Sequence, residues 1–414
     1  MYQYIYKNHQ NIFFSLLVIV SSFSISCQHF KNQKISSNQH NQKSDHHDNL
    51  VTQLTNLLST TSFWDQPITN ETLQLISDSS FDITKEVLDH QSWLNVYQFR
   101  NKIKHSFYQA SLDPHLFIKQ LETYCEQRLR QARHELKLNA ILNLDDDNYQ
   151  EFFHKPVYQH QRDPMSWSQM YSLIKYGDPE SLDYFSSKIA QMILKHAGQD
   201  IKMNPEDWIL ATPAGFQEDE PAAKKASLIL GQKIADKLGI ELAPVYLTKK
   251  QTVYYSDLDN ALTRFDLAMT QYEKRKTSKK HLIIVDDAAV SGATFWAVMA
   301  AFGPHIKVYS ACIVDVRCQN MSVEGVLNHA SVQGADSLSP ILNHESAEIS
   351  SRTLLSVLNA DKKTLAKMLN SLTENRLKTL YLTAKASHRL RKRDETGNFQ
   401  FIENYYFKTT GLKS

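Results

Sequence analysis

Two adjacent carboxylates, Asp286 and Asp287, directly follow the apolar segment 281–285, His-Leu-Ile-Ile-Val. A short apolar run is typical of a strand buried in a parallel sheet, and ligands of such sheets bind beyond the carboxyl ends of the strands. Burying two unpaired carboxylates costs several kcal/mol, so the pair is poorly suited to a core. We therefore expect Asp286 and Asp287 to face a ligand that offers hydrogen-bond donors or a cation.

A short loop of small and hydroxyl-bearing residues follows the two carboxylates and opens a predicted helix. It consists of Val290, Ser291, Gly292, Ala293 and Thr294. Free backbone amides, two hydroxyls and the positive end of a helix dipole meet in such a loop, which suits an anion. Phosphoryl-transfer and response-regulator folds also place aspartates after an apolar strand, but they do not explain this loop. Carboxylates beside an anion site predict a ligand with vicinal hydroxyls and a phosphate, such as a ribose 5-phosphate.

Segment 282–294 resembles the phosphoribosyl-pyrophosphate signature of type I phosphoribosyltransferases. In that signature an apolar strand precedes two acidic residues, two small or apolar residues and a Thr/Ser-Gly-x-Thr loop. The resemblance implies that Asp286 and Asp287 hold the ribose 2′- and 3′-hydroxyls, directly or through Mg²⁺, and that residues 290–294 surround the 5-phosphate. Ala288 and Ala289 replace larger apolar residues, and Val290 stands where some members carry a catalytic aspartate.

The same resemblance places two further elements. The predicted strand 208–212 leads into the small residues of a pyrophosphate-binding loop, Pro213, Ala214 and Gly215, and small residues let backbone amides approach an anion. Lys224 and Lys225 either add positive charge there or lie on a solvated helix face. Lys249 and Lys250 precede a polar, tyrosine-rich segment, 252–280, where the family keeps a flexible hood. These two lysines would neutralise departing pyrophosphate and count as catalytic with the two aspartates, or else belong to a surface hairpin.

The pattern around these motifs predicts an α/β fold. Apolar segments at 208–212, 242–247, 281–285 and 307–316 alternate with helical segments at 222–238 and 292–302, which implies right-handed crossovers and a parallel sheet. We expect a phosphoribosyltransferase-like α/β domain over 165–330. Helical periodicity predicts a helical N-terminal region over 50–160 and a helical C-terminal region over 340–414. In the latter, residues 394–398 resemble a turn before a terminal hairpin strand.

The N-terminus resembles an export or anchoring signal. An apolar, charge-free run at 12–26 precedes Cys27, so residues 1–27 are interpreted as a signal peptide or membrane anchor, and the Ser26-Cys27 pair resembles a lipoprotein cleavage site. Residues 28–49 are polar and of low complexity, as expected of a disordered linker. Lysines after the apolar run would instead keep the chain on the cytoplasmic face of the membrane. Both locations stay open.

Net charge excludes a global field that would attract nucleic acid, because 46 basic and 44 acidic side chains leave a formal charge of +2. Any anion site must therefore be local. A basic cluster near the C-terminus could contact substrate or nucleic acid, or could be ordinary surface; it comprises Arg389, Arg391, Lys392 and Arg393.

Two functions follow from the resemblance. The first is an enzyme of nucleotide metabolism, a Mg²⁺-dependent transferase that moves the phosphoribosyl group from phosphoribosyl pyrophosphate to a small nitrogenous acceptor and releases pyrophosphate. The second is a non-catalytic sensor of a phosphoribosyl ligand, which Val290 in place of an acid keeps open. No nucleic-acid partner is expected, membrane attachment would involve the N-terminus, and formation of a homodimer stays open.

Overall fold

The computed structural model describes residues 38–60, 63, 66–78, 80–109, 115–158, 165–216, 223–248, 261–303, 306–317 and 335–412. The predicted signal or anchor at 1–27 lies outside these residues, as do Lys249 and Lys250. Among the helices described, none is long and apolar enough to cross a membrane.

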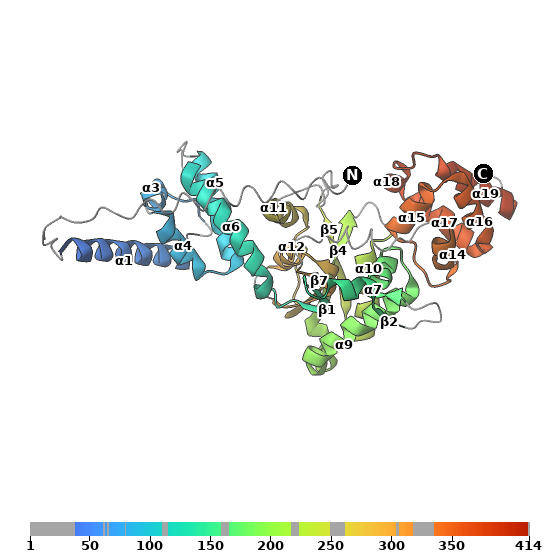
Figure 1. The fold of residues 1–414 in the computed structure, drawn as a ribbon, viewed down its shortest axis with the longest axis horizontal. Coiled ribbons are helices and arrows are strands. Elements are labelled where there is room, and N and C mark those ends of the chain that lie inside the picture. The colour runs from blue at the N-terminus through green and yellow to red at the C-terminus, as the bar shows by residue number, and fades with distance from the viewer. Residues whose placement is uncertain are drawn as a thin grey trace, which may run out of the picture.

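A five-stranded parallel sheet forms the centre of the molecule, with strand order β1-β7-β6-β4-β5 (Figure 1). The strands are β4 (Trp208–Phe216), β5 (Glu241–Leu247), β6 (His281–Ala289), β7 (Lys307–Val316) and β1 (Asn139–Leu144). The predicted α/β fold with a parallel sheet is therefore confirmed. β1 was not predicted, since it comes from the region expected to be helical; it is a partly exposed edge strand that pairs with β7.

Alternating residues of β6 build a core on each face of the sheet. Leu282 and Ile284 join one core together with α11 (Ala261–Gln271) and α12 (Ala293–Phe302). Ile283 and Val285 join the other core together with α9 (Pro179–Met203) and α10 (Ala226–Leu238). All four side chains are fully buried, which explains why the segment is uniformly apolar rather than alternating.

A connecting region leads from β1 to the second core. It contains α7 (Tyr149–His154), the antiparallel pair β2 (Pro156–Tyr158) and β3 (Met165–Ser166), and α8 (Trp167–Lys175). Ser166 caps α8 in a capping box with Gln169, and Asp178 caps α9 by accepting a hydrogen bond from the Ser181 amide at 3.0 Å. These caps fix where both helices begin.

The N-terminal helices extend the core on the α11–α12 face of the sheet (Figure 1). They are α1 (Asn38–Ser59), α3 (Asn70–Asp78), α4 (Phe81–Asp89), α5 (Trp93–Gln109) and α6 (His115–Glu135). α1 begins inside the segment 28–49 that was expected to be a disordered linker, so residues 38–49 are helical instead. On α5, Trp93 and Tyr97 pack edge-on against Phe265 of α11, with ring centroids 5.2 Å and 4.7 Å away.

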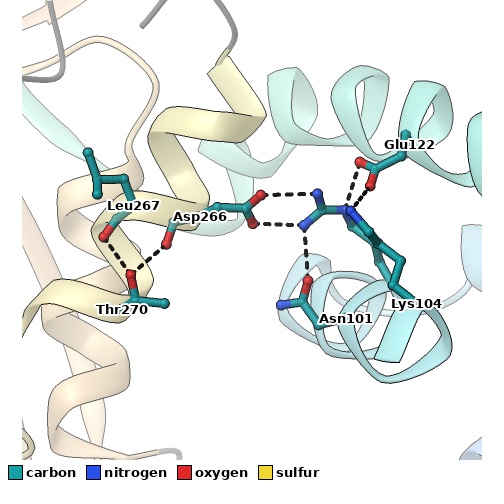
Figure 2. A network of polar contacts seen from close by, with 7 residues as sticks. Asn101, Lys104, Glu122, Asp266, Leu267 and Thr270 are labelled. Atoms are coloured by element: carbon teal, nitrogen blue, oxygen red, sulfur yellow. Dashed lines mark hydrogen bonds and ion pairs between the residues drawn. The ribbon is translucent and has the colours of Figure 1, made fainter. Parts of the chain in front are cut away.

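Buried Arg100 joins the N-terminal helices to α11. Figure 2 labels its carboxylate partners, Glu122 and Asp266. Arg100 of α5 donates two hydrogen bonds to the Asp266 carboxylate, at 2.7 and 3.0 Å, and one to Glu122 of α6 at 2.8 Å. The arginine side chain is only 5% exposed. The bidentate geometry makes this a strong link between α5 and the helix that follows residues 249–260 in the chain.

The C-terminal helices gather on the opposite side of the sheet from α1 (Figure 1). They are α14 (Ala335–Asn343), α15 (Ser351–Leu358), α16 (Lys362–Ser371), α17 (Glu374–Ala386), α18 (His388–Arg391) and α19 (Asn398–Thr410). α19 shows that the predicted terminal strand was wrong. The Asp394 carboxylate accepts hydrogen bonds from the Asn398 and Phe399 amides, at 2.9 and 2.7 Å, so the residues interpreted as a hairpin turn start a helix.

Replacing Arg100 by Ala should lower the free energy of unfolding by about 3 kcal/mol, because two carboxylates then lose their buried partner. Lys104→Ala is the matched control, since Lys104 lies on the same helix and also pairs with Glu122 but is 43% exposed. We expect that change to cost less than about 1 kcal/mol. Urea denaturation of both variants measures the difference. Equal midpoints would show that Arg100 contributes no more to the free energy of unfolding than the exposed Lys104 does.

Candidate functional site

The two motifs singled out in the sequence meet at a switch point of the sheet. From β4 the chain crosses through α10 to β5 on one side, and from β6 it crosses through α12 to β7 on the other. Such a reversal opens a crevice at the carboxyl ends of the two central strands. Ala211 of β4 pairs with Ile284 of β6, so Gly215 and Asp286 both lie just beyond this pair, at the same edge of the sheet.

Asp287 is held by two side chains of α8. The Tyr171 hydroxyl donates a hydrogen bond to Asp287 Oδ2 at 2.6 Å, and the Lys175 ammonium forms an ion pair with the same oxygen. Tyr171 and Lys175 are four residues apart, so one face of α8 carries both. Neither residue was predicted, because only the fold brings α8 to the end of β6.

The two carboxylates have opposite electrostatic character. Burial and the adjacent charge of Asp287 raise the pKa of Asp286 well above its ordinary value. Burial alone would also raise the pKa of Asp287, but the charge of Lys175 and the hydrogen bonds from Lys175 and Tyr171 lower it. Asp287 is thus a stable anion fixed by the protein, whereas ionised Asp286 requires a donor or a cation from a ligand.

The loop at 290–294 has the conformation of an anion cradle. Gly292 has φ 75° and ψ 1°, a left-handed conformation that favours glycine, and it is the N-cap of α12. The Ser291 hydroxyl accepts a hydrogen bond from the Ala293 amide at 3.3 Å. The remaining first-turn amides of α12 have no carbonyl partner within the helix, so they are available to an anion.

Val290 faces the protein interior. Its partly buried side chain packs against the core on the α9–α10 face. The structure thus uses this position for packing, and no proton-accepting side chain stands there.

The segment Pro213–Gly215 continues β4, and a lysine covers its end. Ser227 of α10 donates a hydrogen bond to the Pro213 carbonyl at 2.8 Å, which fixes the end of the strand against the helix. A Cβ atom on Gly215 would lie 3.4 Å from Lys225 Cε, so the aliphatic part of Lys225 lies directly over the glycine. Lys225 is also the N-cap residue of α10, whose dipole adds positive charge at this end of the strand.

The structure separates the two neighbouring lysines. Lys224 Nζ forms an ion pair with Glu348 of the C-terminal region at 3.0 Å. Lys225 lies over Gly215 instead; burial lowers the pKa of its ammonium, and the negative charge of Asp286 opposes that shift. Only Lys225 of this pair therefore belongs to the site. The roles predicted for Lys249 and Lys250 fall on residues outside those described.

Asp286 and Asp287 are the acidic groups at this site that a metal ion could contact. Within the described ranges no cluster of three or more His, Cys, Asp or Glu side chains could hold a metal ion. Mg²⁺ commonly takes one or two carboxylates and completes its shell with water and substrate phosphates. Asp286 beside Asp287 fits that kind of site, in which a ligand supplies the other oxygens.

The chain matches no known protein-family model, and no curated protein is similar to it in sequence.

Replacing each aspartate by asparagine should change the free energy of unfolding in opposite directions. At pH 7, Asp286→Asn should raise the free energy of unfolding by about 1 kcal/mol, because it removes a charge held beside another carboxylate. Asp287→Asn should lower it by about 3 kcal/mol, because Lys175 and Tyr171 lose their anionic partner.

The gain from Asp286→Asn should be complete above the raised pKa of Asp286, shrink as the pH falls below that pKa, and vanish near the ordinary pKa of an aspartate, where the unfolded chain is protonated as well. Denaturation midpoints measured from pH 7 to pH 4 test both statements. Asp236→Asn on the exposed face of α10 is the control. A destabilising effect of Asp286→Asn at pH 7 would show that the electrostatic assignment is wrong.

Proposed function

We propose that the protein binds phosphoribosyl pyrophosphate together with Mg²⁺ and transfers the phosphoribosyl group to a nitrogenous acceptor, releasing pyrophosphate. One observation carries the proposal: the carboxylate pair, the glycine-capped start of α12 and the lysine-covered end of β4 lie together at the switch point of a parallel sheet. Each group matches one part of the donor, which combines a phosphate, vicinal hydroxyls and a pyrophosphate.

The binding role of each group follows from its chemistry. The amides at the start of α12, with Ser291 and Thr294, would hold the 5-phosphate. Asp286 would accept hydrogen bonds from the ribose hydroxyls, and Asp287, already fixed by α8, would set the position and charge of its neighbour. Gly215 and Lys225 would receive the pyrophosphate. Bound Mg²⁺ would screen the charge of the pyrophosphate oxygens.

Catalysis in such a site needs no protein nucleophile. As the C1′–O bond breaks, its electron pair leaves with pyrophosphate and positive charge develops on the ribosyl group. The acceptor nitrogen then forms the C1′–N bond and releases its proton to solvent. Asp286 and Asp287 would stabilise the positive charge and Lys225 the departing negative charge, so that catalysis is chiefly positioning and electrostatics. Lys249 and Lys250 would assist the leaving group. The hood predicted over 252–280 is wrong for its second half, because Ala261–Gln271 form α11 and pack in the core with the N-terminal helices.

A sensor that binds the donor without turnover is the second candidate. The interior position of Val290 favours it, because no acid at this position can accept the acceptor's proton. Release of pyrophosphate from the donor, assayed across a panel of purine, pyrimidine and other nitrogenous acceptors, distinguishes an enzyme from a sensor.

Asp286→Asn should weaken binding of the Mg²⁺–phosphoribosyl pyrophosphate complex at least about tenfold, since a charged hydrogen-bond acceptor is lost. We expect this variant to keep its fold, so the loss reports on the ligand and not on unfolding. Isothermal titration calorimetry measures the affinity, with Asp236→Asn as a control of equal charge change. Unchanged affinity in Asp286→Asn would remove the proposed role of the carboxylate pair.

The proposal also requires that the site face the compartment that contains the donor, which is a cytoplasmic metabolite. We expect a tagged protein to resist protease added to intact cells, whether or not the predicted Cys27 anchor is present. Fractionation of the wild type beside Cys27→Ser reports on the anchor separately. Digestion of the protein in intact cells would show that the site lies outside the cell, and would contradict the proposed phosphoribosyl transfer.

A further inference from the structure

The C-terminal helices dock directly on the end of α8, which carries Lys175. The Ser350 hydroxyl donates a hydrogen bond to the Lys175 carbonyl at 2.7 Å, and the Thr353 hydroxyl donates one to the Tyr176 carbonyl at 2.5 Å. Ser350 and Thr353 are completely buried. Gly177 has φ 77°, and a Cβ atom there would lie 2.7 Å from the Glu348 carbonyl oxygen, so the two backbones are in close contact.

The same helices also dock on the segment that carries Lys225. Ser351 donates from its amide to the Lys224 carbonyl at 3.0 Å and from its hydroxyl to the Ala223 carbonyl at 2.7 Å. The Ala223 amide in turn donates to the Ser387 hydroxyl at 3.2 Å. Residues 223 and 224, which directly precede Lys225, are thus held from both α15 and the start of α18.

These contacts fix the backbone beside both lysines of the site, Lys175 and Lys225. Lys175 and Lys225 come from different elements of the α/β domain, yet the backbone beside each is bonded to residues 350–351. Any shift of the C-terminal helices would therefore move both lysines relative to Asp286 and Asp287.

A third cation comes from the C-terminal helices themselves. Arg389 is two residues beyond Ser387 on α18 and is partly buried. Burial and the positive charges of Lys175 and Arg389 lower the pKa of Lys225. The hydrogen bond between the Ala223 amide and Ser387 holds the start of α18 beside the segment that carries Lys225. Holding Lys225 and Arg389 near each other is favourable when an anion of high charge binds beside them. In Figure 1, α15 and α18 belong to the side of the C-terminal group that faces the sheet.

We propose that the C-terminal helical region is an integral part of the ligand site, in which its docking contacts position Lys175 and Lys225 and Arg389 binds the pyrophosphate group. The inference rests on the proposed function and adds a residue from outside the α/β domain. A guanidinium suits this role because its planar donors can contact two phosphate oxygens at once.

The ligand role of Arg389 is tested by calorimetry with three probes: Mg²⁺–phosphoribosyl pyrophosphate, Mg²⁺–pyrophosphate and ribose 5-phosphate. Arg389→Gln should weaken the first two about tenfold and leave ribose 5-phosphate within twofold, because the arginine lies on the Lys225 side of the site. Arg389→Lys should recover part of the loss. Lys392→Gln removes an exposed charge just after α18 and should leave all three affinities within twofold.

Equal binding of phosphoribosyl pyrophosphate by wild type and Arg389→Gln would overturn the role of Arg389 while leaving the proposed function intact. Failure of the wild type to bind that probe would overturn the proposed function and the inference with it.

The positioning role is tested with a matched pair of glycine substitutions. Gly177→Ala and Gly239→Ala both place a side chain on a left-handed residue, with φ 77° and 67°, but only the first introduces a contact with the C-terminal region. Gly177→Ala should weaken binding of Mg²⁺–pyrophosphate at least about fivefold relative to Gly239→Ala, through displacement of Lys175 and Lys225. Equal affinities in two folded variants would show that docking does not position the site.

Discussion

The ion pair between Lys175 and Asp287 is the interaction on which the arrangement of the site depends. Two neighbouring carboxylates at the end of a buried strand repel each other, and the surrounding protein strengthens that repulsion. Lys175 and the Tyr171 hydroxyl compensate the charge of Asp287, whereas the other carboxylate, Asp286, accepts a hydrogen bond from the Asp287 backbone amide. The same residues attach α8 to β6, and the carbonyl of Lys175 receives the C-terminal helices. Through Lys175, the Lys175–Asp287 ion pair therefore links the sheet, helix α8 and the C-terminal region.

The two helical regions attach to the α/β domain by different physical means. The N-terminal helices share an apolar core with α11 and α12 and add the buried Arg100–Asp266 pair. The C-terminal helices form a third core, which also includes Ala223 and packs against Leu173 and Tyr176 of the α/β domain. They add small buried hydroxyls that bond to backbone carbonyls of that domain. Hydroxyl-to-carbonyl contacts are short and directional, so they set position more finely than apolar packing does. This difference suits a region that borders the ligand site.

The features that could be predicted from the sequence are those that a short stretch of chain contains. β6, the carboxylate pair and the left-handed Gly292 all lie within one segment, and the hydrophobic pattern of the neighbouring strands sufficed for a parallel sheet. Tyr171 and Lys175 could not be assigned, because their positions beside Asp287 arise only when distant segments meet. The basic cluster that contains Arg389 could be singled out, but the sequence did not decide between a substrate or nucleic-acid contact and ordinary surface. β1 was missed because a short, half-exposed edge strand has little apolar signal. The turn-like residues before α19 were misinterpreted because aspartate and glycine serve equally at hairpins and at helix starts, and only the spacing of Ile402 and Tyr406 favours the helix.

The place of β1 in the sheet has a consequence for how the chain folds. Asn139 of β1 reaches the carbonyl of Ser310, 171 residues later in the sequence, and within the sheet β1 pairs with β7. During synthesis the N-terminal helices emerge first, but the strand that ends them has no partner until the chain has grown past β7. Closing so long a loop is slow, and an unpaired strand can meanwhile associate with other chains. We therefore expect the β1 edge of the sheet to close late, and the unpaired strand to be a point at which folding is exposed to aggregation.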